Sequence, residues 1–344
     1  MLNKIFFIIT FILFFLLLII GMEQDYNYRE NIQTDANYIP RYIENINVEN
    51  YHCVGKSNQY YQKIPKRALV VGENIIETFI ALGIEDNILL AAGYGNPYFL
   101  PNEKYAAKYY NLKIENQINL GFERTLALHP DLIVGGQVIF SNRKLKSTKF
   151  WNDRNIHTFC SLNANSPTNK NFQETLENEF KFIIDLGKIY DKENQAMGLV
   201  EAMKKDIYFI NSKTKNLKKP KVMIIEDMGG IVVYGKNKLA GDICTKLNGD
   251  VQSSIQPMIG IEDLIKTDPD VLFVVKSGGD PEDAAEVFRK MRALQNIKCV
   301  KNNRVYGIAL NYTYNSAIKT GEGIRKFAAG MYPQIAHELE GYNL

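Results

Sequence analysis

Tyrosines and cations occupy segments that follow the predicted strands of this chain. The side chains of interest are Tyr94, Tyr98, Arg143, Lys276, Tyr312 and Tyr314. A tyrosine offers a flat apolar ring with one hydroxyl, while arginine and lysine neutralise an anion through charge-assisted hydrogen bonds. Because open α/β sheets bind ligands beyond the carboxyl ends of their strands, we expect these residues to line one cleft. The set predicts a binding site for an anionic ligand.

Two glutamates occupy matching places in the two halves of the chain. Residues 123–134 read ERTLALHPDLIV, and residues 262–273 read EDLIKTDPDVLF. In each phrase the glutamate opens a predicted short helix, Pro-Asp ends it, and a buried apolar strand follows. The helix dipole stabilises a first-turn carboxylate by roughly 0.3–1 kcal/mol, which accounts for either glutamate alone. It does not account for the repetition, so Glu123 and Glu262 are predicted to serve as paired charged contacts.

Strand-then-helix patterns must position these residues, and they recur in both halves. Predicted strands at Arg67–Gly72 and Lys221–Glu226 each precede a helical stretch, which Leu82-Gly83 closes in the first half and Asn248-Gly249 in the second. Strands that alternate with helices indicate parallel sheets. The predicted fold is therefore α/β, with two Rossmann-like lobes containing central parallel sheets, a single long interdomain helix, and a ligand cleft between the lobes.

Helical spacing also divides the chain into parts. The second of two amphipathic stretches, at 172–190 and 192–217, would extend almost 40 Å at about 1.5 Å per residue. The expected parts are a signal peptide or membrane anchor at 1–22, a tether with a first strand at 23–64, an N-terminal lobe at 65–190, an interdomain helix at 191–217 and a C-terminal lobe at 218–344. Within the tether, Tyr51–Val54 and Tyr60-Tyr61 are expected to pair as a small hairpin.

The first residues indicate export. Residues 5–20 are apolar apart from Thr10, a length that suits both a long signal peptide and a short membrane anchor. The sequence lacks a convincing Ala-x-Ala cleavage site, which favours an uncleaved anchor. No cysteine follows the apolar run, so bacterial lipid attachment has no acceptor in this chain.

Composition excludes some classes of function. A net charge of +3, from 41 basic and 38 acidic residues, gives no dominant electrostatic field, so nucleic acid is not an expected partner. The cysteines are scattered at Cys53, Cys160, Cys244 and Cys299, without the paired spacing of a zinc or iron-sulfur site. We expect no protein-bound metal and interpret the cysteines as buried thiols in preference to disulfides.

Several stretches carry a family resemblance. They are PKRALVV at 65–71, ETFIALGI at 77–84, the two glutamate phrases, GDICTKLNG at 241–249 and VKNNRVY at 300–306. In this order they resemble the periplasmic-binding-protein family of iron-siderophore, heme and cobalamin ABC importers with a helical interdomain connection, over about residues 64–334. In that family, lobe-tip glutamates meet arginines of the membrane permease, and by position Glu123 and Glu262 are their counterparts. The missing lipid-bearing cysteine is a departure from many relatives.

The resemblance implies a function. The chain is expected to be a monomeric substrate-binding component in the periplasm or on the outer face of the cytoplasmic membrane, delivering a ferric siderophore to a permease dimer. Iron would enter only as part of the bound chelate, with no cofactor. The segment at 135–160, with its basic helix, favours a siderophore. Heme, with Tyr94, Tyr98 or Tyr312 as axial ligand, and cobalamin remain alternatives.

Functions of other classes also remain open. A membrane-tethered α/β enzyme could use the same cleft, but the sequence contains no Gly-x-Ser-x-Gly, P-loop or His-Glu-x-x-His motif. Glu73 and Glu226 could act as acid and base only if they faced one another. A surface scaffold without a small ligand is a third possibility. We predict no catalytic residue and no enzymatic activity.

Overall fold

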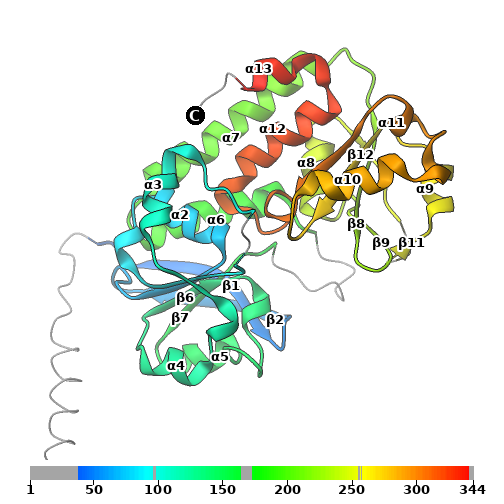
Figure 1. The fold of residues 1–344 in the computed structure, drawn as a ribbon. Helices are drawn as coiled ribbons and strands as arrows, with labels where there is room; N and C mark the ends of the chain where they lie inside the picture. The colour runs from blue at the N-terminus through cyan, green and yellow to red at the C-terminus, as the bar shows by residue number, and fades with distance from the viewer. Residues whose placement is uncertain (1–37, 96–97, 164–172, 255, 257, 341–344) are drawn as a thin grey trace, which may run out of the picture. The chain divides into compact units, whose positions relative to one another are not determined.

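A computed structural model describes residues 38–95, 98–163, 173–254, 256 and 258–340 (Figure 1). The predicted signal or anchor at 1–22 and the tether up to residue 37 lie outside the described residues. Residues 41–61 and 65–344 form one compact unit, to which the following description applies. No helix of the described residues combines the length and the apolar character needed to cross a bilayer.

The N-terminal lobe is built on a parallel five-stranded sheet with the order β5-β4-β3-β6-β7. Its strands are β3 (Ala68–Val71), β4 (Ile88–Gly93), β5 (Ile114–Asn116), β6 (Leu132–Gly135) and β7 (His157–Cys160). Its helices are α2 (Glu73–Ala81), α3 (Glu103–Asn111), α4 (Phe122–Ala127) and α5 (Thr148–Asn152). The order reverses beside β3, the first strand of this sheet along the chain, which is the arrangement of a doubly wound sheet.

The C-terminal lobe contains a six-stranded sheet in which β8, β12 and β13 are parallel neighbours. Its strands are β8 (Lys221–Asp227), β9 (Ile231–Val233), β10 (Asp250–Val251), β11 (Met258–Ile259), β12 (Val271–Lys276) and β13 (Val305–Ala309). The helices are α8 (Leu239–Lys246), α9 (Ile261–Thr267), α10 (Pro281–Lys290), α11 (Lys298–Lys301), α12 (Thr320–Met331) and α13 (Ala336–Glu340). β9 and β11 run antiparallel to their neighbours.

Two helices connect the lobes. α6 (Leu176–Ile189) is followed by α7 (Glu193–Thr214), whose 22 residues span about 33 Å. α7 packs against both α6 and α12, so it is supported along its length. The expectation of two α/β lobes with central parallel sheets is confirmed.

The repeated Pro-Asp dipeptide fastens the base of each sheet. Asp131 accepts hydrogen bonds from the backbone N–H groups of Lys66 and Arg67, at 2.7 and 2.9 Å, just before β3. Asp270 accepts one at 2.9 Å from the N–H of Lys221, where β8 begins. The duplicated phrase therefore has a structural role at the end of each sheet opposite the strand carboxyl ends.

An antiparallel hairpin covers one edge of the N-terminal sheet. It consists of β1 (Arg41–Glu49) and β2 (His52–Tyr61), so the two segments expected to pair with one another lie in a single strand. The side-chain amide of Asn45 bonds both the N–H and the C=O of Cys160, and that of Gln59 does the same at Thr158. These amides satisfy the outward backbone groups of β7, which would otherwise form an open sheet edge.

Candidate ligand cleft and docking surface

Tyr94 is held at the carboxyl end of β4. Its backbone N–H donates to Glu73 Oε1 at 2.7 Å, and Glu73 is the first residue of α2. The N-cap of α2 is Gly72, whose φ of 115° is a conformation that favours glycine. Desolvation, with a further contribution from Glu73, raises the pKa of Tyr94 to about 12, although 49% of the residue surface is exposed. The phenol is therefore neutral at physiological pH.

Tyr314 belongs to the other lobe. It lies in the turn between η5 (Leu310–Tyr312) and η6 (Ala317–Lys319), after β13. Burial raises the pKa of Tyr314, and so do its neighbours Glu174, Tyr94 and Glu179. Tyr94 thus contributes to the electrostatic surroundings of Tyr314, and a cleft shared by the two residues stays a prediction.

Tyr234 extends this group, and the sequence reasoning missed it. Its hydroxyl donates to Glu226 Oε2 at 2.6 Å, and burial followed by Glu226 raises its pKa. Glu174 and Tyr314 act on the same phenol. Tyr234 follows the short antiparallel strand β9, whereas the predicted cleft loops follow parallel strands. The Gly229-Gly230 turn was the available signal that the chain doubles back there.

The other predicted tyrosines lie in different surroundings. The hydroxyl of Tyr312 donates to Glu322 Oε2 at 3.0 Å, and Lys326 Nζ lies 5.2 Å from its ring centroid. The Tyr312 hydroxyl is thus hydrogen-bonded within the C-terminal lobe. Tyr98 is 54% exposed, in the segment between β4 and α3.

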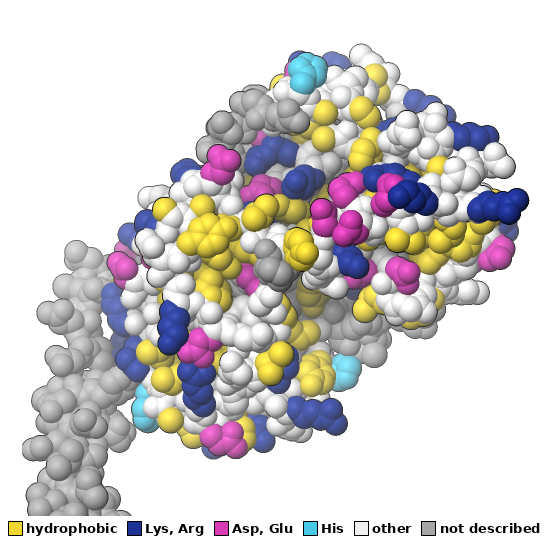
Figure 2. All heavy atoms as spheres, viewed as in Figure 1, with side chains coloured by type: hydrophobic (Ala, Val, Ile, Leu, Met, Phe, Trp, Pro, Cys, Tyr) yellow, Lys and Arg dark blue, Asp and Glu magenta, His cyan; other side chains and the backbone are white. Residues whose placement is uncertain are grey.

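The two predicted cations are exposed. Lys276 is the last residue of β12, at the expected end of the sheet. Arg143 lies in a run of turns before α5. Within the described residues, no contact joins either cation to Tyr94 or Tyr314. The side chains around the cleft tyrosines include the carboxylates of Glu73, Glu174 and Glu226, and Glu174 is paired with Lys238 at 2.6 Å. On the face shown in Figure 2, acidic and basic side chains are interspersed with hydrophobic ones.

Glu123 and Glu262 occupy equivalent places in the two lobes. Each lies exposed in the first turn of a short helix, α4 or α9, after an extended glycine N-cap. The ends of these helices are also held alike. Arg67 donates through Nη2 to the carbonyl of Leu128 at 2.7 Å, and Lys221 Nζ donates to the carbonyl of Thr267 at 3.0 Å. A basic residue just before β3 (Arg67) or at the start of β8 (Lys221) thus fixes the end of the helix that carries the glutamate.

A seam of hydrogen bonds joins the lobes beside the cleft. Asn74 Nδ2 donates to the carbonyls of Asn311 and Asn315, at 3.0 and 3.2 Å. One turn further along α2, Thr78 Oγ1 accepts from the N–H of Ile318 at 3.2 Å. The segment after β13 is therefore attached directly to α2.

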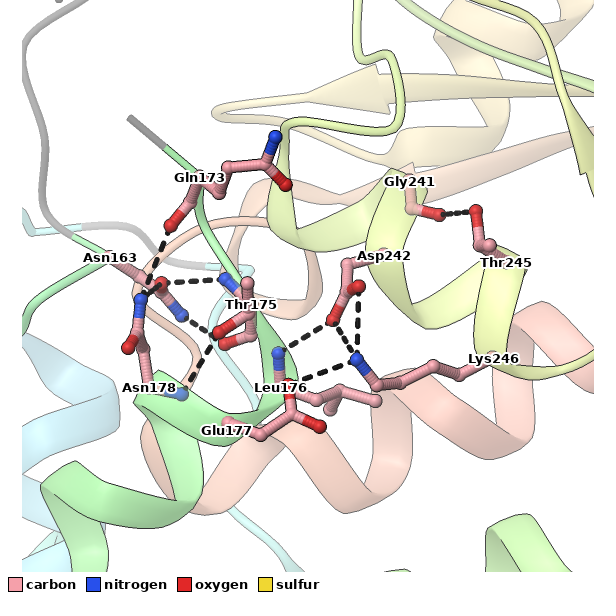
Figure 3. A network of polar contacts seen from close by, with 10 residues as sticks. All are labelled: Asn163, Gln173, Thr175, Leu176, Glu177, Asn178, Gly241, Asp242, Thr245 and Lys246. Atoms are coloured by element: carbon pink, nitrogen blue, oxygen red, sulfur yellow. Dashed lines mark hydrogen bonds and ion pairs between the residues drawn. The ribbon is translucent and has the colours of Figure 1, made fainter. Parts of the chain in front are cut away.

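The start of α6 is tied to α8. Figure 3 shows Asp242 and Lys246 reaching the first turn of α6, where Asp242 Oδ2 accepts from the N–H of Leu176 at 2.8 Å. On the opposite side, Asn163 bonds both the N–H and the C=O of Thr175. Asn163 also donates to Glu179, which is fully buried and accepts from the N–H of Ala317. Through Glu179, α6 thus also holds the segment after β13 that is attached to α2.

A cavity of about 630 Å³ lies between α2, α3, α7 and α12. Its apolar lining includes Ile80, Leu199 and Met203, and its polar lining includes Glu77 and Glu322. Gly198 of α7 also lines it, and a Cβ added there would meet no atom within 4 Å. Among the described residues, no group of three or more His, Cys, Asp or Glu side chains is placed to hold a metal ion.

Two α/β lobes with parallel sheets, joined by the helical segment α6–α7, give this chain the fold of a two-lobed binding protein. Residues 69–311 match the family described as "Periplasmic binding protein", and the chain belongs to this family, as predicted. The chain is similar to an uncharacterised ABC transporter substrate-binding lipoprotein, YvrC, of Bacillus subtilis (strain 168), with 24% identity covering 80% of this chain and 83% of that protein.

Two further proteins show the same likeness. The petrobactin-binding protein YclQ of Bacillus subtilis (strain 168) is 24% identical, over 74% of this chain and 78% of that protein. The crystal structure of a periplasmic binding protein from Veillonella parvula DSM 2008 has a TM-score of 0.77 and 28% identity, covering 87% of this chain and 93% of that one. The likeness thus extends over both lobes.

Proposed function

We propose that this protein is the substrate-binding component of an ABC importer, which captures a ferric siderophore outside the cytoplasmic membrane and delivers it to a permease. The observation that carries the proposal is the match of residues 69–311 to the periplasmic-binding-protein family, on a chain with two α/β lobes. The similarity to a petrobactin-binding protein favours a siderophore. The exported chain acts as a monomer in this proposal.

The protonation state of the cleft tyrosines suits a chelate. Burial and the nearby carboxylates raise the pKa values of Tyr94 and Tyr314, so both hydroxyls stay protonated near neutral pH. A neutral phenol donates a hydrogen bond to an oxygen of the chelate, and its ring packs on apolar parts of the ligand. The siderophore supplies the iron ligands itself, so iron enters only inside the chelate and the protein needs no cofactor.

The predicted cations act at the edge of the cleft. Lys276, exposed at the end of β12, and Arg143, in the turns before α5, attract and neutralise an anionic chelate as it approaches. Tyr98 and Tyr312 complete the proposed ligand surface. Glu123 and Glu262 dock to basic residues of the permease, and their exposed positions favour rapid, reversible association.

Ligand titration of the full chain in detergent tests the proposal. Ferric tris-hydroxamate and tris-catecholate chelates, hemin and cobalamin are added separately, and quenching of intrinsic fluorescence is recorded. We expect saturable binding of a ferric chelate, weakened about tenfold by Tyr94→Phe or Tyr314→Phe because each change removes one hydrogen bond. Tyr208→Phe, at a residue 78% exposed on α7, should leave affinity unchanged.

One result would reject the siderophore as ligand, and another would reject the proposed binding residues. Tighter binding of hemin or cobalamin than of every ferric chelate would assign the cleft to that ligand. Unchanged affinity in both cleft variants, with a chelate bound, would place the site elsewhere in the molecule.

A further inference from the structure

The first two residues of α2 hold the two sides of the cleft. Glu73 Oε1 accepts from the N–H of Tyr94 at 2.7 Å, and Asn74 Nδ2 donates to the carbonyls of Asn311 and Asn315. Successive residues of a helix point about 100° apart, so one helical turn reaches both segments. The segment held by Glu73 belongs to the N-terminal lobe, and the segment held by Asn74 belongs to the C-terminal lobe.

The contact of Glu73 with the end of β4 is close. A Cβ added at Gly93 would lie 2.8 Å from Glu73 Oε1, so only glycine allows the carboxylate to lie against the strand end. The Glu73 residue is 8% exposed. Since Tyr94 follows Gly93 directly, this carboxylate fixes where the tyrosine leaves the strand.

The contact of Asn74 encloses a short turn. The two carbonyls that it binds belong to Asn311 and Asn315, and Tyr312, Thr313 and Tyr314 lie between them. Asn315 adopts a left-handed backbone with φ of 46°, a conformation that asparagine tolerates better than most residues. One side-chain amide thus fastens both ends of the turn that carries Tyr314.

We propose that Glu73 and Asn74 are positioning residues of the ligand cleft, Glu73 for Tyr94 and Asn74 for Tyr314. The start of α2 then sets the separation of the two tyrosines across the lobes. The inference rests on the proposed function, in which both tyrosines contact the ligand. It adds that ligand affinity depends on two side chains that need not touch the ligand.

A double-mutant cycle tests the role of Asn74. Asn74→Asp keeps the shape of the side chain but removes its N–H donors and places a carboxylate against two carbonyls. With a ferric tris-hydroxamate or tris-catecholate chelate as probe, we expect about tenfold weaker binding in the wild-type background, and no further loss in a Tyr314→Ala background. Asn211→Asp is the matched control, because Asn211 Nδ2 also donates to a carbonyl, that of Lys246 at 2.9 Å. It should leave affinity unchanged.

The test for Glu73 compares a conservative substitution with a truncation of the side chain. Glu73→Gln retains the acceptor Oε1 and should retain affinity, whereas Glu73→Ala should lose about tenfold. That loss should vanish in a Tyr94→Ala background. Equal losses with and without the cleft tyrosine, in either cycle, would overturn the positioning role and leave a general structural one.

A ligand-free measurement separates this inference from the function it rests on. In protein with isotope-labelled tyrosine rings, Asn74→Asp should shift the NMR signal of Tyr314, and Asn211→Asp should not. If no chelate binds the wild type but the Tyr314 signal shifts, the positioning stands and the proposed ligand fails. An unmoved Tyr314 signal overturns the positioning itself.

Discussion

The carboxylate of Glu77 lies 3.4 Å from the ammonium of Lys319, and both side chains are 1% exposed. Glu77 belongs to α2, whereas Lys319 ends η6 just before α12, so this buried ion pair joins the two lobes. Glu322 lies 2.7 Å from the same ammonium, and Asn102 donates to both carboxylates. Burial raises the pKa of Glu77 to about 7, although Lys319 opposes the shift.

The stability of the protein should therefore depend on the protonation of Glu77. Its pKa in the folded state lies above the ordinary value of 4.5, so the folded chain binds more protons between these values. The stabilising contribution of protonated Glu77 is fully present below about pH 4.5 and is lost as the pH rises through about 7. From pH 5 to pH 8, the unfolding free energy of the wild type should fall because Glu77 ionises. In Glu77→Gln this fall should be smaller by roughly 2–3 kcal/mol. Urea unfolding measures this difference. Glu201→Gln, on the exposed surface of α7, should follow the wild type. Equal pH dependence in Glu77→Gln and the wild type would contradict the assignment.

Reversing the charge of the tip glutamates should uncouple ligand binding from transport. Glu123→Lys and Glu262→Lys place positive charges opposite the basic permease residues of the proposed contact. Because like charges repel, uptake should fall at least tenfold while chelate affinity is retained. Cellular iron uptake and in vitro titration provide the two readings. Glu103→Lys is the matched control, because Glu103 is also exposed in the first turn of a helix, α3. Loss of uptake in the control as well would show a general charge effect.

Two glycines near the lobe junction should respond in opposite ways to alanine. Gly198 lies inside α7 beside open space, so Gly198→Ala should stabilise the protein by about 0.5–1 kcal/mol through helix propensity. At Gly187 an added Cβ would lie 2.5 Å from Ala196 Cβ, so Gly187→Ala should destabilise by about 1–3 kcal/mol. Thermal unfolding of the two variants checks the contrast. A lower melting temperature for Gly198→Ala would show that the space is filled in solution.

The side-chain amides that cover β7 should contribute to stability. Asn45→Leu and Gln59→Leu each leave backbone groups of the strand without partners in a buried place, at a cost of about 1–3 kcal/mol. Asn58→Leu, on the exposed side of β2, should cost less than about 0.5 kcal/mol. Denaturant unfolding compares the three. If all three variants matched the wild type, water would be satisfying the strand edge.

The sequence predicted the repeated framework because repetition and periodicity are local signals. The matching phrases at 123–134 and 262–273 indicated two related lobes, and the apolar spacing at 192–217 indicated the helix now seen as α7. The paired positions of Glu123 and Glu262 were readable for the same reason. Their helices do begin alike in the two lobes.

Contacts between distant parts of the chain had no such signal. Asn74 bonds Asn311 and Asn315 across 237 and 241 positions of the chain, and the sequence around these residues has ordinary helix or loop composition. Asn45 and Gln59 were interpreted as part of a polar tether, because a side chain that replaces a missing strand neighbour does not alter hydrophobic periodicity. Tyr234 was overlooked because the short antiparallel strand before it leaves no clear pattern.

The aspartates at the sheet bases have an evolutionary consequence. Asp131 and Asp270 fasten the amino ends of the strands, at the end of each sheet away from the proposed ligand surface. Loops at the rim are then free to diverge without unravelling the scaffold. Related carriers could acquire different cargoes by changing rim residues alone, while inheriting the same foundation.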